Sequence, residues 1–195
     1  MKNIILILIF ATSLNFASAQ LVPSVQFGVK GGANFSSLSS PGSTFSSSNE
    51  AGYLAGIWAR FGALGFNFQP EIYATSKSVE ISASNNSKQT FTSVDVPLLF
   101  GGKVGALGLG GRFYTGPVVS FAVDNGQNFF DAAGKAVSLK FHDQSYAWQF
   151  GAGLDIQSIS IDLRYEAGLT TQNYNNGQTK INLFSLSLAY RLFKL

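Results

Sequence analysis

The sequence predicts an all-β fold, a transmembrane antiparallel up-and-down β-barrel of about eight strands. Three observations predict it: a charge-poor composition, an alternation of apolar and polar residues, and a strict alternation of short and long connections. Charged residues make up only 12% of the chain, whereas typical soluble domains carry about 25%. After the N-terminal segment, no apolar run approaches the ~20 residues of a membrane helix. An apolar, charge-poor chain without such helices is typical of strands that face lipid.

The N-terminal segment has the pattern of a cleaved signal peptide. A basic start, Met1–Asn3, precedes the apolar run Ile4–Phe10, and Ala17-Ser18-Ala19 fits a small-x-small cleavage site. The alternative, a membrane anchor, is disfavoured because the run is short and no charge cluster follows it. We therefore expect a signal peptide over 1–19 and one barrel domain over 20–195. The chain has no cysteine, which excludes a lipoprotein anchor, a disulfide and a thiolate metal site.

The predicted strands alternate with two kinds of connection. Short turns are expected at 62–65, at 105–106 and around Ser158, and long polar connections at 37–50, 78–90, 124–144 and 171–180. Short periplasmic turns and longer outer loops are typical of outer-membrane barrels, and an even strand count places both termini on the periplasmic side. The strands are expected near 25–36, 51–61, 65–77, 91–104, 107–123, 145–157, 159–170 and 181–193.

Each strand separates an apolar face from a polar face with a period of two. The segment 159–170, for example, sets Ile159 and Leu163 against Asp162 and Arg164. Alternation alone also suits a half-buried soluble strand, but here the charges collect on the polar face. Exposed to water, the apolar face would form a very large patch, whereas it is compatible with lipid. A soluble sandwich is disfavoured because no second layer covers that face.

The polar face predicts a network of charges inside the barrel. Its six basic and five acidic members nearly cancel, 6 − 5 = +1, so nearly every charge can find a partner. Unpaired charges in a confined lumen are costly, and the favoured interpretation is a polar plug that ties opposite walls together. The partner of Arg112 stays open, with Asp95 one candidate from the adjacent strand. The predicted members are Lys30, Arg60, Glu71, Asp95, Lys103, Arg112, Asp155, Asp162, Arg164, Glu166 and Arg191.

Aromatic residues cluster toward the strand ends. They suit girdles at the two membrane interfaces, and they equally suit any β-strand. The residues in question are Phe35, Phe61, Tyr73, Phe91, Tyr114, Tyr146, Tyr165 and Tyr190.

Several short motifs, in order, resemble the small bacterial outer-membrane β-barrel family that includes PorT-like proteins. Gly28–Ser36 resembles the first strand of that family, and Phe68–Tyr73 followed by Ser76-Lys77 resembles its third. The resemblance covers nearly the whole chain after the signal peptide, and its motifs are specific for the fold and an outer-membrane location rather than for a biochemical role. Further motifs in the expected order are Val94–Leu99, Thr115-Gly116-Pro117, Gly151–Asp155 and Arg164–Leu169.

We expect no catalytic, cofactor-binding or metal-binding residues. His142-Asp143 with Ser145 suggests a hydrolase, but near neighbours in one loop do not form a base held against a nucleophile. Asp124–Asn128 lacks the later bidentate acid of a calcium loop. The glycines at 101–102 and 108–111 have no strand–loop–helix context for phosphate, and relief of crowding explains them better.

Two functions from different classes follow. The first is a non-enzymatic surface or assembly protein whose barrel anchors partner-facing loops; the second is a narrow solute or ion pore. The PorT-like resemblance implies a third, a role in protein secretion. The expected partners are outer-membrane lipid, the barrel-assembly machinery and a protein bound through the loops. The net charge of +3 without a basic cluster gives no reason to expect nucleic acid.

The signal peptide gives the first testable prediction. The mature chain should begin at Gln20, because cleavage follows the small-x-small pattern at Ala17–Ala19. Mass spectrometry of the protein from the membrane fraction measures this directly. Retention of residues 1–19 on the mature protein would contradict the prediction.

Overall fold

A computed structural model describes residues 23–39, 50–81, 87–107, 109–123, 144–170, 172–174 and 177–195. The predicted signal peptide lies outside these residues, so its cleavage stays a prediction. Among the described residues no helix has the length and apolarity needed to cross a membrane. The strands are β1 (Ser24–Ser39), β2 (Glu50–Ala63), β3 (Phe66–Ile81), β4 (Ser87–Ala106), β5 (Leu109–Val123), β6 (Gln144–Ile156), β7 (Ile159–Gly168), β8 (Gln172–Tyr174) and β9 (Gly177–Lys194).

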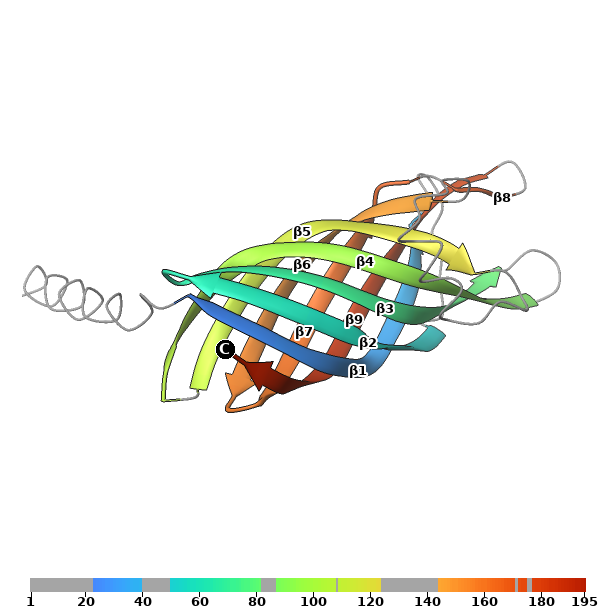
Figure 1. Cartoon of the computed structure of the whole chain (residues 1–195). Helices are drawn as coiled ribbons and strands as arrows, with labels where there is room; N and C mark the ends of the chain where they lie inside the picture. The colour runs from blue at the N-terminus through green and yellow to red at the C-terminus, as the bar shows by residue number, and fades with distance from the viewer. Residues whose placement is uncertain are drawn as a thin grey trace, which may run out of the picture.

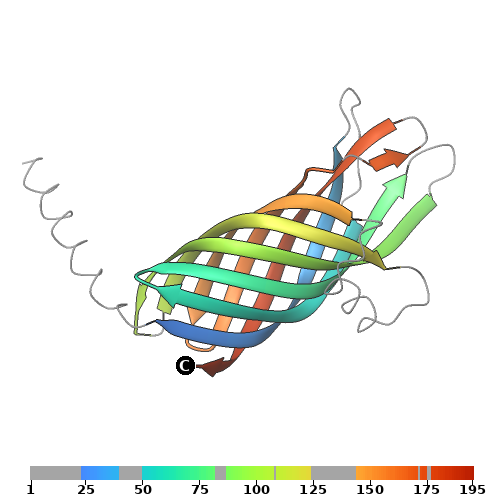
Figure 2. The ribbon, with the colours of Figure 1, turned by 45° about the horizontal axis from the view of Figure 1, so that its top comes forward.

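Eight of these strands close into an antiparallel barrel. Consecutive strands pair from β1 to β7, β7 then pairs with β9, and β9 pairs with β1 to close the sheet. Figures 1 and 2 show the tilted strands wrapping around one axis. The predicted fold class, an eight-stranded up-and-down barrel, is confirmed.

The strands extend further than the sequence pattern predicts. The β3–β4 ladder continues to the pair Ile81 and Ser87, within the predicted connection 78–90. The short β8, within the predicted connection 171–180, pairs with the start of β9. Backbone pairing needs no apolar face, whereas the alternation that predicts strands arises only where one face meets lipid. The prediction therefore misses the polar strand ends.

Tight turns lie at one end of the barrel, called here the turn end; the opposite end is the loop end. Between β2 and β3, Leu64 and Gly65 both have positive φ, 52° and 82°, as a two-residue type I′ turn requires. Gln157, between β6 and β7, also has positive φ. The predicted short turns at 62–65 and around Ser158 are thus present.

The register of the closed sheet gives the stagger of the barrel. We start at Val25 on β1 and move from each residue to the residue paired with it on the next strand. After all eight strands, this path returns to β1 at Phe35. The stagger is 35 − 25 = 10 residues, and such a shear requires the strands to tilt against the barrel axis. The intermediate positions on this walk are Phe61, Phe68, Phe100, Thr115, Phe150, Tyr165 and Phe184.

That row is almost entirely aromatic and lies on the outer surface. Phe68 stacks on Phe61 and on Phe100, with ring centroids 6.3 and 4.8 Å apart. At the single gap, Thr115 accepts a hydrogen bond from Trp148 Nε1 at 2.6 Å. The outer aromatics thus include a row that spirals around the barrel, in which neighbouring rings can pack across strands.

Two aromatics proposed for the girdles lie inside instead. Tyr73 and Tyr114 are buried in the lumen, on the same strand faces as Glu71 and Arg112. Trp58 and Leu99 are buried there as well. The lumen therefore combines charges with large apolar side chains.

Glycines make room for the large inner side chains. A Cβ at Gly151 would collide with the ring of Tyr114, and one at Gly28 with the ring of Trp58. The interior of an eight-stranded barrel is only just wide enough for its side chains. A glycine facing an aromatic ring across neighbouring strands lets the ring lie flat against the wall.

Filling this space should destabilise the barrel. Gly151→Ala is expected to cost about 1–3 kcal/mol, because overpacking a filled interior displaces its neighbours. Gly111→Ala is the matched control on the outer face, since a Cβ there meets nothing within 4 Å. Urea unfolding in lipid vesicles, followed by tryptophan fluorescence, measures both. Equal stabilities of the two variants would show that Gly151 is not needed for packing.

Candidate functional site

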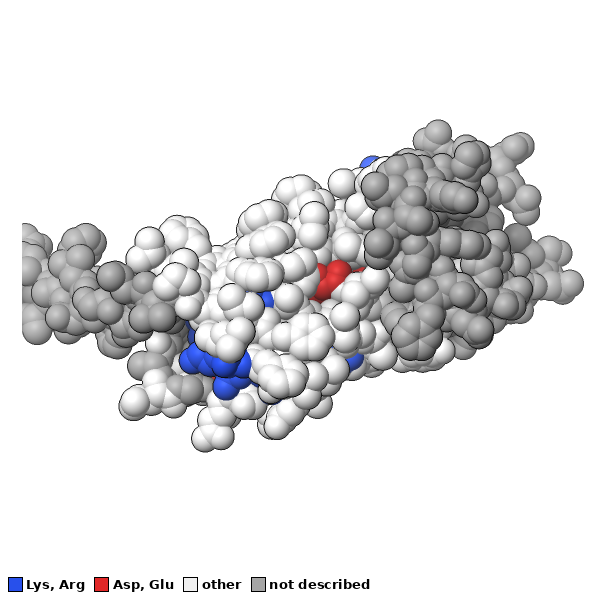
Figure 3. Space-filling model, in the orientation of Figure 1, with Lys and Arg blue, Asp and Glu red and all other residues white. Residues whose placement is uncertain are grey.

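Most members of the predicted charge network turn inward. Nine of the eleven predicted network members are at most 5% exposed, whereas Lys103 and Arg191 are partly exposed. Figure 3 accordingly shows a wall of mainly uncharged atoms, with basic residues gathered toward the turn end. The nine are Lys30, Arg60, Glu71, Asp95, Arg112, Asp155, Asp162, Arg164 and Glu166.

Lys77 is also buried inside and is missing from the prediction. Its signal was present, because Lys77 continues the inward series Glu71, Tyr73, Thr75 at steps of two. The predicted strand ended at Lys77, however, so that residue was not assigned a face.

The central level of the lumen is an ion pair that crosses the barrel. Arg164 on β7 donates through Nη1 and Nη2 to the two carboxylate oxygens of Glu71 on β3, each at 2.7 Å. These strands are four apart in either direction around the sheet, so the pair joins opposite walls. Lys30 on β1 donates to the same carboxylate at 2.8 Å. A bidentate arginine–carboxylate pair is among the strongest polar contacts in proteins.

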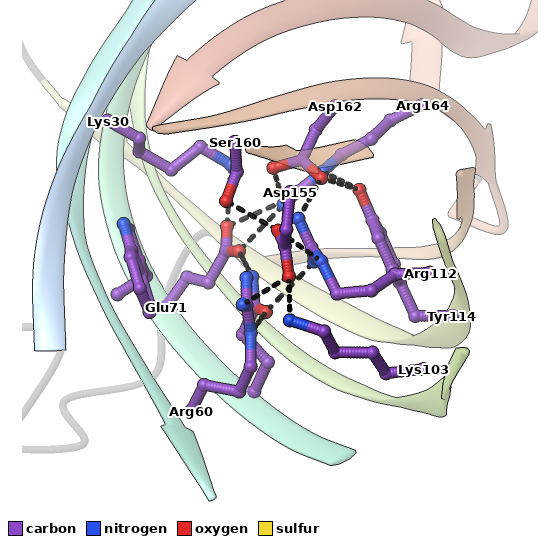
Figure 4. A network of polar contacts seen from close by, with 12 residues as sticks. Lys30, Arg60, Glu71, Lys103, Arg112, Tyr114, Asp155, Ser160, Asp162 and Arg164 are labelled. Carbon is purple, nitrogen blue, oxygen red and sulfur yellow. Dashed lines mark hydrogen bonds and ion pairs between the residues drawn. The ribbon is translucent and has the colours of Figure 1, made fainter. Parts of the chain in front are cut away.

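The turn-end cluster, Arg60, Lys103, Arg112, Asp155 and Asp162, lies below this central pair. Asp155 accepts from Lys103 Nζ at 2.6 Å, from Arg112 Nε at 2.8 Å and from Arg60 Nη1 at 3.3 Å. Arg112 also donates to Asp162 at 2.8 Å. Figure 4 shows these cations, from three strands, pointing at Asp155.

The loop-end cluster consists of Lys77, Asp95 and Glu166. Lys77 Nζ lies 3.1 Å from Asp95 and 3.7 Å from Glu166. Gln149 donates to Glu166 and to the Tyr73 hydroxyl, each at 2.8 Å, and so connects the cluster to the wall of β3. These contacts are longer than those of the central pair.

The candidate pairing of Arg112 with Asp95 is wrong. Although β4 and β5 are adjacent, Asp95 is opposite Ser120, whereas Arg112 is opposite Lys103. Eight residues along β4 therefore separate Asp95 from the level of Arg112. Arg112 pairs instead with Asp155 and Asp162.

Aromatic rings fill the space between the charges. The guanidinium of Arg60 lies 4.7 Å from the ring centre of Trp58, and that of Arg164 lies 5.0 Å from the ring of Tyr114. Lys30 approaches the ring of Tyr73 at 5.0 Å. Such cation–π contacts favour a buried cation.

Within the described part of the chain, no three histidine, cysteine or acidic side chains gather as metal ligands would. The loop residues considered for catalysis or calcium, His142-Asp143 and Asp124–Asn128, lie outside the described residues. The lumen side chains form ion pairs and hydrogen bonds that connect opposite walls of the barrel.

Comparisons with known proteins agree with this architecture. The family model "Outer membrane protein beta-barrel domain" matches residues 17–172. No curated protein matches the chain. Among solved structures, Neisserial surface protein A is similar, with TM-score 0.50 and 10% identity over 86% of this chain and 97% of that chain. At this identity the likeness shows the fold alone.

Two further solved structures match less closely. Ail, the attachment invasion locus protein of Yersinia pestis in complex with the heparin analogue sucrose octasulfate, has TM-score 0.40 and 14% identity over 86% of this chain and 99% of that chain. The N-terminal β-barrel domain of Pseudomonas aeruginosa OprF has TM-score 0.39 and 9% identity over 86% and 99%.

The central pair gives an asymmetric prediction. Glu71→Leu removes the carboxylate that Lys30 and Arg164 share, leaves Arg164 only the longer contact with Asp162 at 3.6 Å, and should cost about 3–5 kcal/mol. Arg164→Leu should cost less, because Lys30 still pairs with Glu71. The double variant should cost less than the sum of the two. Urea unfolding in lipid vesicles measures all three.

These three variants form a double-mutant cycle. Its control is a second cycle with Arg112→Leu and Asp95→Leu, two residues that do not contact each other. Their effects should add within about 0.5 kcal/mol. Additivity in the Glu71–Arg164 cycle, or strong coupling in the control cycle, would contradict the observed pairing.

Proposed function

The chain belongs to the outer membrane protein β-barrel domain family, and we propose that it is a non-enzymatic membrane anchor whose lumen is a structural plug. Its four long connections would then carry the interaction with a partner in the cell envelope. The proposed location is the outer membrane of a Gram-negative bacterium, reached after cleavage of the signal peptide. Outer-membrane lipid and the barrel-assembly machinery are its proposed general partners.

The observation that carries the proposal is a set of three ion pairs between opposite walls at three levels. Arg60 and Asp155 join β2 to β6 at the turn end, Arg164 and Glu71 join β7 to β3 at the centre, and Lys77 and Glu166 join β3 to β7 at the loop end. Each pair spans four strands. A solute would have to break all three, each in a lumen narrowed by Trp58, Tyr73 and Tyr114.

With the lumen plugged, the long connections between strands are the part of the protein that can bind a partner. They are rich in serine, asparagine and glycine, which supports recognition of a partner more than catalysis. The PorT-like resemblance gives this proposal its finer form, a role in protein secretion in which the connections contact other envelope proteins. The competing function is a narrow solute or ion pore.

Conductance separates the plug from the pore. The purified protein should give no single-channel steps in planar bilayers, because the lumen of about eight strands is filled. The double variant Lys77→Ala/Glu166→Ala removes the loop-end ion pair, together with the contact of Lys77 with Asp95, and should stay closed, since the other two cross-barrel pairs remain. Urea-resistant tryptophan emission in vesicles provides the control for insertion. Stable, reproducible steps in the wild-type protein would overturn the plug and establish the pore.

A further inference from the structure

The charges of the lumen nearly cancel, but they are distributed unevenly along its axis. The loop-end cluster carries 1 − 2 = −1, the central group of Lys30, Arg164 and Glu71 carries 2 − 1 = +1, and the turn-end cluster carries 3 − 2 = +1. Arg191 and Lys194 also lie near the turn end of β9. Neither has an ion pair within the described part of the chain, and both add positive charge at this end. This end of the barrel is short of anions.

Asp155 shows the shortage most clearly, because three cations converge on one carboxylate. Its Oδ2 accepts from Lys103 and Arg60, and its Oδ1 accepts from Arg112 and from Ser160 Oγ at 2.6 Å. Both oxygens are therefore fully used. Like charges held this close repel one another, and a second anion would relieve that repulsion.

Arg60 provides an independent sign of a missing partner. Its Nε donates to Gln69 Oε1 at 2.6 Å and its Nη1 to Asp155, but its Nη2 has no hydrogen-bond partner among the described residues. Arg60 is only 2% exposed, and a buried charged donor without a partner is costly. The side chain is held in place against Trp58, so the donor cannot easily turn away.

We propose that the turn end of the lumen is an oxyanion-binding site, in which a phosphate group accepts from Arg60 Nη2 and from Lys103. Arginine and lysine are the side chains that bind phosphate best. Lys103 is the entry point, since 23% of its side chain is exposed whereas the rest of the cluster is buried. On binding, its ammonium turns from the crowded Asp155 toward the anion. The phosphate comes either from inorganic phosphate or from the headgroup of a phospholipid beside the barrel mouth.

The chain contains a reporter for this site. Trp58 packs on Arg60 and is one of only two tryptophans; the other, Trp148, lies on the outer surface. In a Trp148→Phe background, tryptophan emission therefore reports the Arg60 environment alone. The protein is held in a phosphate-free maltoside detergent and titrated with sodium phosphate, with sodium chloride at matched ionic strength as the comparison.

Phosphate should produce a saturable change in Trp58 emission, and chloride should not. Arg60→Gln should abolish the saturable change, and Lys103→Gln should weaken the affinity. Lys180→Gln, an exposed cation on the loop-end part of β9, is the matched control and should leave the titration unchanged. Asp155→Asn should bind phosphate about tenfold more tightly, because it removes the competing carboxylate and 1.4 kcal/mol corresponds to tenfold in Kd.

The source of the phosphate is distinguished by competition with short-chain phosphatidylglycerol. A lipid that competes at lower concentration than inorganic phosphate identifies the headgroup as the ligand, and the reverse identifies the free anion. A linear response, an equal response to chloride, or a saturable response that persists in both Arg60→Gln and Lys103→Gln would overturn the site. If Arg60→Gln fails to fold, the Lys103→Gln variant still tests the site, because Lys103 is partly exposed. None of these outcomes depends on whether the barrel conducts ions.

Discussion

The ion pair between Arg164 and Glu71 crosses the lumen, and the rest of the structure depends on the geometry that permits it. A buried charge without its partner is strongly destabilising, so the two strands that carry these residues, β7 and β3, must face each other at one height. This happens only when eight strands close with the observed register. A slip of one residue would move the lumen charges into lipid and the apolar residues into the lumen. Closure of the barrel, the register of its strands and the pairing of the lumen charges therefore depend on one another.

Filling the lumen requires a second condition, that large and small side chains alternate around the wall. Tyr114 lies where Gly151 leaves space, and Trp58 lies where Gly28 does. The rings in turn contact the cations, Arg60 against Trp58 and Arg164 against Tyr114. The glycines thus act on the ion pairs indirectly, because they let the aromatic rings lie flat and leave the centre of the barrel to the charged groups.

The alternation of residues such as Ile161, Asp162 and Leu163 was sufficient to predict which strand face meets lipid. It also predicted which charges turn inward, because that property is local to each strand. The pairing of charges is not local: Glu71 and Arg164 are 93 residues apart and meet only through the stagger of the whole sheet. The same reason explains the wrong candidate for Arg112. Lys77 was missed because its strand continues beyond the apolar pattern, and Trp58 because an apolar residue was not expected among the lumen charges.

The distances in the ion pairs, and the number of partners that each charge shares, change along the barrel axis together with the access of water. At the centre, where water is most remote, Arg164 and Glu71 are bidentate at 2.7 Å. At the loop end Lys77 divides itself between two carboxylates at 3.1 and 3.7 Å, and at the turn end the partly exposed Lys103 shares Asp155 with two arginines. The central group of Lys30, Arg164 and Glu71 carries 2 − 1 = +1, so the positive excess extends from the centre to the turn end, and the negative excess lies at the loop end. Water and ions screen charges at the two ends, whereas each cation at the centre is paired within the protein.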